Sequence, residues 1–254
     1  MTLEDLQAEL DAIGRPKPSA YAMRELAAHR ELARAWDLAH PEAAARWKAL
    51  AERVTAATRE RETQEREAAD TDRRLRTQGE RLSRSGVGER SLAAAVNPDD
   101  TEALAVVKRW LPDHSLTWLA LCGTKGTGKS VAATWAVREV IRGGGTARFR
   151  RTSDLARLSN FDAGADELDC LKRVHLLVLD DFGSELLSAF ARDKLDEVLD
   201  HRHEHYGRTV LTSNLSWIGA GGMAERLGER LTDRLKQAGR CVQLSPANSL
   251  RRRA

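Results

Sequence analysis

The residues whose types and spacing best suit chemistry form one glycine-rich segment, Gly123-Thr124-Lys125-Gly126-Thr127-Gly128-Lys129-Ser130. It fits the pattern G-x-x-x-x-G-K-[ST], in which the backbone turns tightly and points its N–H groups at the phosphate oxygens of a nucleotide. Residues 116–122 predict a buried strand before it, and residues 130–142 predict a helix after it, whose positive end would add to the attraction. We expect Lys129 to reach the β- and γ-phosphates, Ser130 to bind Mg²⁺, and Val131 to complete the nucleotide-binding segment. The alternative, a glycine-rich turn with a chance lysine, does not account for the strand and the helix.

A second candidate is an apolar run that ends in two acids, Val174-His175-Leu176-Leu177-Val178-Leu179-Asp180-Asp181. This pattern predicts a buried strand that brings carboxylates to the carboxyl-terminal edge of a parallel sheet, where ligands of open α/β sheets bind. We expect Asp180 to hold Mg²⁺ through water and Asp181 to polarise the attacking water as general base. A buried strand that ends in Asp-Asp is unremarkable alone, and its position downstream of the phosphate loop is what favours these roles.

Two further polar segments follow. Residues 208–212 predict a strand that runs into Thr212-Ser213-Asn214, and an asparagine at a strand tip could orient the attacking water. The alternative is a simple Ser-Asn turn. Further on, a predicted helix with the sequence GERLTDRL carries Arg230 and Arg234. These arginines could act on a phosphate, or they could form surface ion pairs only.

The composition indicates one moderate α/β core. Of 254 residues, 41% are hydrophobic and 31% are charged, and the net charge of +3 permits nucleic-acid binding without requiring it. Cys122, Cys170 and Cys241 are far apart in the sequence, which predicts reduced thiols. No apolar run approaches the roughly 18 residues of a membrane span, and the first residues lack the apolar core of a signal peptide. We therefore expect a cytoplasmic protein with no membrane partner.

The first 95 residues predict helices, and nothing in them suggests catalysis. Residues 3–13 and 20–38 carry apolar side chains at helical spacing. Residues 42–83 are rich in alanine, arginine and glutamate, with interleaved charges that favour one long solvated helix. We interpret residues 1–95 as a helical domain and linker that docks a partner. The alternative is a solvated linker helix with no specific ligand.

The chain resembles the AAA+ ATPases of the DnaC/IstB type in four motifs that occur in a fixed order: GTKGTGKS, LLVLDDFGSE, TSNL and GERLTDRL. Its closing residues resemble the tails of phage-type and mobile-element members. The members are replicative helicase loaders and transposition helper ATPases. The resemblance covers about residues 118–253. It implies an α/β fold, in which a P-loop AAA+ core has a parallel five-stranded sheet of order 5-1-4-3-2, lacks a full C-terminal lid and follows an all-α N-terminal domain. The ATPase domain would span residues 96–247, and a basic tail residues 248–254.

The resemblance also implies roles for residues. The chain would be an ATPase that uses ATP and Mg²⁺, is stimulated by DNA and oligomerisation, and associates with itself through ATP sites at subunit interfaces. Asn214 would be the working residue of the sensor 1 motif. An arginine of GERLTDRL would reach the neighbour's γ-phosphate, with Arg234 favoured and Arg230 second. Single-stranded DNA would contact basic residues, for which there are three candidate groups: Arg148, Arg150 and Arg151 around Phe149, then Lys172-Arg173, and the tail Arg251-Arg252-Arg253.

The leading hypothesis is a loader that binds a hexameric replicative helicase of the DnaB type and single-stranded DNA, and releases the helicase on ATP hydrolysis. The alternative is a transposition helper that assembles on duplex DNA and recruits a transposase. A small-molecule kinase would need an acceptor pocket and a lid, and would not require an arginine in trans. A non-hydrolysing ATP-binding adaptor would show no turnover even with partner and DNA, and the intact Lys129, Asp180 and Asp181 argue against it.

Overall fold

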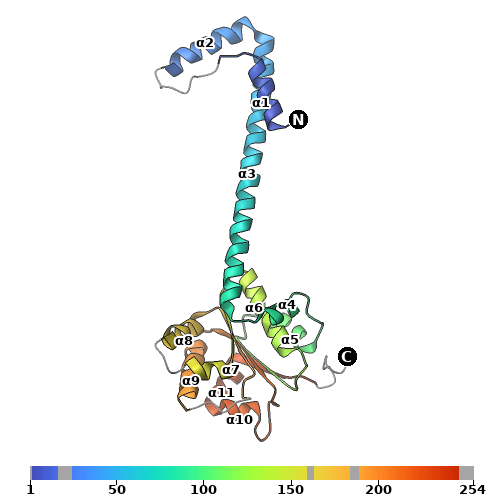
Figure 1. Ribbon diagram of the computed structural model, residues 1–254, viewed down its shortest axis with the longest axis vertical. Coiled ribbons are helices and arrows are strands. Elements are labelled where there is room, and N and C mark those ends of the chain that lie inside the picture. The colour runs from blue at the N-terminus through green and yellow to red at the C-terminus, as the bar shows by residue number, and fades with distance from the viewer. Residues whose placement is uncertain (1, 17–24, 159–162, 184–188, 246–254) are drawn as a thin grey trace. The chain divides into compact units, whose positions relative to one another are not determined.

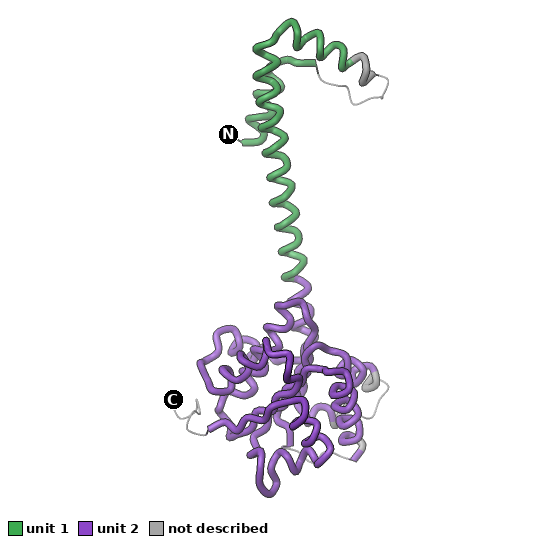
Figure 2. The backbone as a smooth tube through the Cα atoms, turned by 180° about the vertical axis from the view of Figure 1, so that it is seen from behind, with its two compact units in different colours: residues 1–75 green, residues 76–254 purple. Residues whose placement is uncertain are grey.

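The computed structural model describes residues 2–16, 25–158, 163–183 and 189–245 (Figure 1). The chain forms two compact units, Met1–Leu75 and Arg76–Ala254 (Figure 2). The basic tail proposed at residues 248–254 lies outside the described residues.

The division between the units falls inside helix α3 (Pro41–Ser85). The sequence predicts a domain boundary at residue 95, whereas the structure includes residues 76–95 in the second unit. The physical reason is packing: Val87 is buried in the core of the second unit, and Leu82 and Leu92 pack against that core. A reading of helical spacing alone does not reveal such long-range contacts.

In the described part of the first unit, the regular elements are α1 (Leu3–Ala12), α2 (Glu25–Ala39) and the first part of α3. Thr2 caps α1 through reciprocal hydrogen bonds with Asp5. The core is small, since its buried members are Leu6, Leu10 and Leu50. Residues 59–75 of α3 are all exposed. The predicted helical N-terminal region is therefore confirmed, with an apolar face limited to the first turns of α3.

The second unit is built on a five-stranded sheet. Its strands are β1 (Trp118–Cys122), β2 (Ala147–Arg151), β3 (Leu176–Asp180), β4 (Arg208–Ser213) and β5 (Gly239–Gln243). Their order is β2-β3-β4-β1-β5, and every neighbouring pair is parallel. This confirms the predicted order 5-1-4-3-2. In a parallel sheet all carboxyl ends lie at one edge, so the ends of β1, β3 and β4 meet there.

Helices cover both faces of this sheet, as Figure 1 shows. The helices are α4 (Glu89–Ala94), α5 (Glu102–Trp110), α6 (Lys129–Arg142), α7 (Thr152–Leu158), α8 (Ala163–Arg173), α9 (Ala189–Glu204), α10 (Met223–Leu227) and α11 (Glu229–Ala238). Leu119 and Leu121 of β1 pack with α5 and α6 on one face. Trp118 and Ala120 pack with α9, α10 and α11 on the other. Because alternate residues of β1 are buried on opposite faces, the strand is apolar throughout.

No helix follows β5 in the described residues, which end at Ser245. Within the same described part of the chain, no helix is both long and apolar enough to cross a membrane.

Candidate nucleotide-binding site

The glycine-rich loop joins the end of β1 to the first turn of α6. Gly123, Gly126 and Gly128 have positive φ angles of 142°, 91° and 82°, a region that other residues rarely adopt. A Cβ atom at Gly128 would also lie 2.9 Å from Thr101 Oγ1. Gly128 precedes α6 and provides no side-chain cap. The first N–H groups of α6 are therefore available to an anion, as the sequence predicts.

Lys129 is buried beside this loop. Its Nζ donates hydrogen bonds to the carbonyl oxygens of Gly123, at 2.8 Å, and Thr124, at 2.9 Å. Burial lowers the pKa of Lys129, and the nearby carboxylates of Asp180 and Asp181 partly oppose that effect. Because these carbonyl groups are neutral, a bound phosphate would be a stronger partner for the ammonium group.

Oxygen atoms from three elements gather at the end of β3. Ser130 Oγ donates a hydrogen bond to Asp180 Oδ1 at 2.7 Å, and Thr212 Oγ1 donates to the same oxygen at 2.6 Å. Thr212 Oγ1 also accepts a hydrogen bond from the backbone N–H of Asp181, at 3.1 Å. Hydroxyl and carboxylate oxygens are the ligands that Mg²⁺ prefers. The neighbouring Ser130 and Asp180 therefore fit the predicted Mg²⁺ ligands, and Thr212 orients the carboxylate of Asp180.

Asp181 follows β3 in a left-handed conformation, with φ of 60°. This backbone region costs of order 1–3 kcal/mol for a non-glycine residue and is concentrated at functional sites. Asn214 Nδ2, at the tip of β4, donates a hydrogen bond to Asp181 Oδ1 at 2.5 Å. The turn and this bond hold the Asp181 carboxylate at the carboxyl-terminal edge of the sheet.

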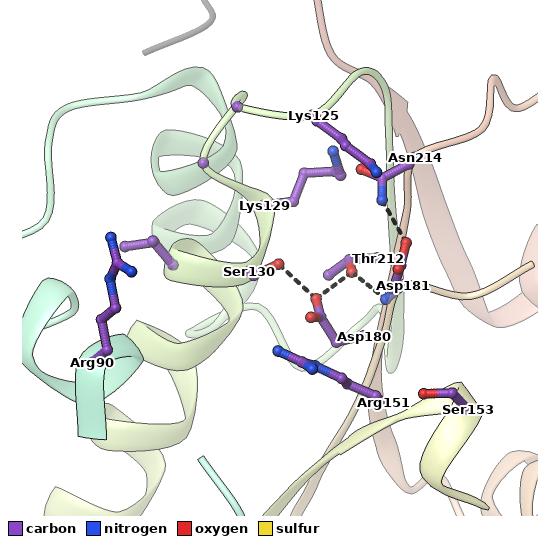
Figure 3. Close-up of a pocket in the computed structure, with 13 residues that line it drawn as sticks. Arg90, Lys125, Lys129, Ser130, Arg151, Ser153, Asp180, Asp181, Thr212 and Asn214 are labelled. Atoms are coloured by element: carbon purple, nitrogen blue, oxygen red, sulfur yellow. Dashed lines mark hydrogen bonds between the residues drawn. The ribbon is translucent and has the colours of Figure 1, made fainter. Parts of the chain in front are cut away.

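These residues surround one cavity of about 750 Å³, shown in Figure 3. Its lining residues are Arg90, Lys125, Gly126, Gly128, Lys129, Ser130, Val131, Arg151, Ser153, Asp180, Asp181, Thr212 and Asn214. Of the predicted binding residues, Gly123, Thr124 and Thr127 shape the loop without lining the cavity. The cavity presents four cationic side chains and two carboxylates, which suits a strongly anionic ligand such as a nucleoside triphosphate.

The sequence does not predict Arg90, Arg151 or Ser153 in this cavity, and it includes Thr212 only as a member of the segment Thr212-Ser213-Asn214, without a role of its own. The sequence predicts Arg151 as a DNA contact, whereas in the structure it lies opposite Asp180 in the parallel pairing of β2 with β3. A signal for this position is available in the sequence, because Arg151 ends β2 and Asp180 ends β3, and parallel strands end at the same edge. Arg90 belongs to the short helix α4, which packs against α6. That long-range contact has no local sequence signal.

Arg230 and Arg234 do not line the cavity of their own chain. Both lie on α11 and form ion pairs with Asp200 of α9. The side chain of Arg230 is 66% exposed and that of Arg234 is 18% exposed. Neither arginine therefore takes part in the nucleotide site of the single chain.

The fold and the site define a P-loop nucleotide-binding protein with an AAA+ core. The sequence profile of the IstB-like ATP binding proteins matches residues 31–254, so the chain belongs to this family. The insertion sequence ATP-binding protein y4pL of Sinorhizobium fredii is 34% identical over 134 residues, which cover 48% of this chain and 53% of the relative. The chain thus spans about half the length of that curated relative.

Solved structures share the fold at lower identity. The DnaC helicase loader is 22% identical, with a TM-score of 0.53 over 62% of this chain and 100% of its own. DnaI is 19% identical, with a TM-score of 0.51 over 63% of this chain and 95% of its own. DnaA from Aquifex aeolicus, bound to AMPPCP, is 20% identical, with a TM-score of 0.50 over 61% of this chain and 53% of its own. The predicted DnaC/IstB type of AAA+ ATPase is confirmed.

Proposed function

We propose that this chain hydrolyses ATP at a site that a second copy completes, and that it uses the ATP cycle to assemble on DNA and recruit the transposase of an insertion sequence. The observation that carries the ATPase activity is the convergence of Lys129, Ser130, Asp180, Asp181 and Asn214 on one cavity. These side chains come from α6 and from the ends of β3 and β4. Residues that together bind phosphate, metal and water at one edge of a sheet support hydrolysis of a nucleoside triphosphate.

In this proposal the triphosphate lies along residues 123–131, with Lys129 at the β- and γ-phosphates. Ser130 and Asp180 would hold Mg²⁺, which would neutralise charge on the phosphates. Asp181 would accept a proton from the attacking water, and Asn214 would orient that water and the carboxylate. The hydrogen bond between Asn214 and Asp181 supports the shared role.

The motif GERLTDRL supports completion of the site by a neighbour, because a transition state for phosphoryl transfer needs additional positive charge. Both arginines pair with Asp200 in their own chain, so an arginine that acts in trans would first have to leave Asp200. The motif favours Arg234 as the residue that enters the neighbour's site, while the greater exposure of Arg230 keeps it as the second candidate.

The family match supports an insertion-sequence partner over a replicative helicase. The IstB-like profile reaches from residue 31 to residue 254, so it includes the later part of α2 and all of α3. The sequence identity of this chain to the relative named as an insertion sequence ATP-binding protein is 34%, whereas its identity to the helicase loader is 22%. The loader structure supports the fold alone. This reverses the order of the two hypotheses that the sequence motifs suggest, and leaves the loader of a DnaB-type helicase on single-stranded DNA as the second candidate.

The ATPase proposal is tested by mixing two inactive variants. Asp181→Asn removes the base from a subunit but leaves its arginines, and Arg234→Ala removes one arginine but leaves the base. Each variant alone should lose turnover, by on the order of 10³-fold for Arg234→Ala. An equal mixture should regain activity at about a quarter of the interfaces if the contact is head-to-tail.

A mixture with Arg230→Ala in place of Arg234→Ala assigns the arginine that acts in trans. If neither mixture recovers ATP turnover, the proposal of a shared site is wrong. Phosphate release measured with duplex DNA present is the readout, because assembly is expected to stimulate turnover.

The partner is tested with the full-length protein, duplex DNA and a slowly hydrolysed ATP analogue. Retention of a transposase encoded in the same genome, together with ATP-dependent assemblies on duplex DNA, is the expected result. Retention of the replicative helicase of the same genome, with assembly on single-stranded DNA only, would instead establish the helicase loader.

A further inference from the structure

A second cavity, of about 410 Å³, lies away from the nucleotide site. Its lining residues are Arg81, Arg84, Thr146, Ala147, Arg148, Cys170, Arg173 and Val174. Thr146 and Ala147 are at the beginning of β2, and Val174 is shortly before β3. The cavity is therefore at the amino-terminal edge of the sheet, whereas the nucleotide cavity is at the carboxyl-terminal edge. We name it the arginine pocket, after Arg81, Arg84, Arg148 and Arg173.

The arginine pocket carries an excess of positive charge. Among the described residues that line it, four are arginines and none is a carboxylate. Arg81 donates hydrogen bonds to the neutral carbonyl groups of Gly144 and Gly145. Arg84 forms no ion pair or side-chain hydrogen bond with any residue that the structure describes. Two of the four guanidinium groups thus lack an acidic partner in this part of the chain.

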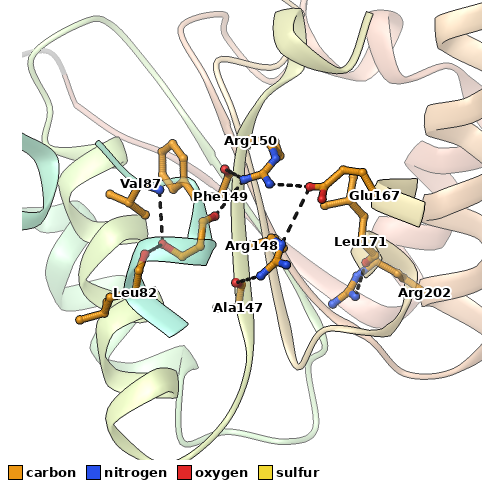
Figure 4. A network of polar contacts seen from close by, with 10 residues as sticks. Leu82, Val87, Ala147, Arg148, Phe149, Arg150, Glu167, Leu171 and Arg202 are labelled. Atoms are coloured by element: carbon orange, nitrogen blue, oxygen red, sulfur yellow. Dashed lines mark hydrogen bonds and ion pairs between the residues drawn. The ribbon is translucent and has the colours of Figure 1, made fainter. Parts of the chain in front are cut away.

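The other two arginines are only weakly neutralised. Arg148 Nε is 3.9 Å from Glu167 Oε1, while Arg150 binds the same oxygen at 2.5 Å. Figure 4 shows both arginines directed at Glu167. The Nε atom of Arg148 is buried with no hydrogen-bond partner among the described residues. Arg173 is 76% exposed and lies 3.3 Å from Asp169, a surface pair of the kind that contributes little.

We propose that the arginine pocket binds phosphate groups of the DNA backbone. A guanidinium group matches a phosphate with two parallel N–H donors, and four such groups from α3, β2 and α8 converge here. The last part of α3 adds to this charge, since residues 76–85 contain three arginines and one glutamate. A row of cations suits a ligand with repeating charges, which favours a nucleic-acid backbone over a single carboxylate.

This inference rests on the proposed function, because assembly on DNA requires a surface that binds phosphates. It also assigns that surface to the edge of the sheet opposite the nucleotide. Arg150, which the sequence analysis groups with the DNA contacts, has a different role. It donates hydrogen bonds to the carbonyl oxygen of Ser85 at 3.0 Å and binds Glu167, so it fastens the end of α3 to β2 and α8.

The test compares two double variants of the full-length protein. Arg84→Gln with Arg173→Gln removes two exposed charges from the arginine pocket. Arg109→Gln with Arg240→Gln is the matched control, because both are exposed arginines of the same unit outside the pocket. Binding to a fluorescent 30-base-pair duplex is measured at several salt concentrations, beside melting temperature and affinity for a fluorescent ATP analogue. Restoring the charge with Arg84→Lys and Arg173→Lys provides the second variant.

The pocket variant should bind duplex DNA about 10- to 100-fold more weakly at 0.1 M salt, and its log–log salt slope should be smaller by about 2. The control should lose much less, and the lysine variant should regain most of the affinity. ATP affinity and melting temperature should stay at the wild-type values in all of them.

Unchanged DNA affinity and salt slope in the pocket variant would overturn this inference and leave the proposed function standing. Stabilisation by inorganic phosphate that is lost in the pocket variant, without a change in DNA binding, would show a small-anion site instead. Loss of transposase with DNA binding intact would assign the pocket to an acidic protein surface. Failure of the wild-type protein to bind duplex DNA in any nucleotide state would overturn both proposals.

Discussion

At the carboxyl-terminal edge of the sheet, charged and polar side chains form hydrogen bonds with one another, whereas at the amino-terminal edge several arginines lie close together with few acidic partners. Ser130 and Thr212 both donate to Asp180, and Asn214 donates to Asp181. In the arginine pocket, by contrast, Arg84 has no partner among the described residues.

The difference indicates two kinds of site. A reaction needs groups that are fixed before the substrate arrives, because reorganisation during the reaction adds to the barrier. A surface that binds a polyanion needs available charge, and its affinity comes largely from the release of counterions. The carboxyl-terminal edge has groups that are fixed in advance, and the amino-terminal edge has available positive charge. The following variants should separate the two edges.

Lys129→Ala should give the largest effect and should be confined to the carboxyl-terminal edge. Removing the cation expected at the β- and γ-phosphates should lower ATP turnover by on the order of 10²- to 10³-fold. Affinity for duplex DNA without nucleotide should remain, because the arginine pocket is at the other edge. Phosphate release and fluorescence anisotropy on DNA measure the two properties.

Lys108→Ala is the matched control for this change, since Lys108 is an exposed lysine on α5 of the same unit. It should leave both properties unchanged. A Lys129→Ala protein that lost nucleotide-free DNA binding as well would contradict the separation of the edges.

Arg202→Met should have the next largest effect, on the stability of the amino-terminal edge. Arg202 is fully buried, and burial lowers its pKa to about 10, so it remains charged at pH 7. It donates hydrogen bonds to Thr209 Oγ1 and to the carbonyl oxygens of Leu171, Lys172, Val174 and Arg208. Of these carbonyl groups, those of Leu171 and Val174 are fully buried in their bonds to Arg202. Since each buried carbonyl left without a partner costs about 1–3 kcal/mol, we expect a loss of about 2–6 kcal/mol.

Urea unfolding followed by near-ultraviolet circular dichroism measures this loss, with hydrogen exchange at the end of α8 as a local readout. Arg173→Met is the control, because Arg173 is exposed and has one weak partner. A loss below about 1 kcal/mol for Arg202→Met would show that these carbonyl groups find other partners, such as water.

Thr212→Val should lower ATP turnover by about tenfold, which corresponds to about 1.4 kcal/mol. Valine keeps the shape of threonine but loses the bonds to Asp180 and Asp181. The affinity for ATP should change little, because the bonds of this hydroxyl group are to Asp180 and Asp181 and not to the phosphate loop. Thr212→Ser, which keeps the hydroxyl, should retain activity. Equal loss in both variants would mean that packing at this position matters as much as the hydroxyl group, and would contradict a specific role of the hydroxyl.

The nucleotide-binding loop, the Asp180–Asp181 pair and Asn214 could be predicted because each lies directly after a strand with a clear apolar pattern. Parallel strand order then brings these ends to one edge. The different roles of the three arginines of β2 could not be predicted in this way. The sequence groups Arg148, Arg150 and Arg151, yet Arg148 lines the arginine pocket, Arg150 binds Glu167, and Arg151 lines the nucleotide cavity.

Position along the strand and alternation between its faces explain the three outcomes, but both require knowledge of where β2 begins and of which helices cover it. The same limit applies to Arg230 and Arg234. Their spacing predicts a helix, while the acid that binds both, Asp200, lies on α9. Partners on distant elements have no local sequence pattern, which is also why Arg90 and the boundary inside α3 could not be predicted.

Asp169→Asn should give the smallest effect and should be limited to the arginine pocket. Asp169 is paired with Arg173 at 3.3 Å and with Lys172 at 3.6 Å. Neutralising this acid should free positive charge and raise the affinity for duplex DNA by about two- to fivefold, because exposed ion pairs contribute about 0.2–1 kcal/mol. The gain should shrink as salt rises, and ATP turnover without DNA should not change. Asp233→Asn, an equal change of charge at an exposed pair on α11, should give a smaller gain. If both variants bind DNA equally well, net charge alone explains the effect, and Asp169 does not act on the arginine pocket.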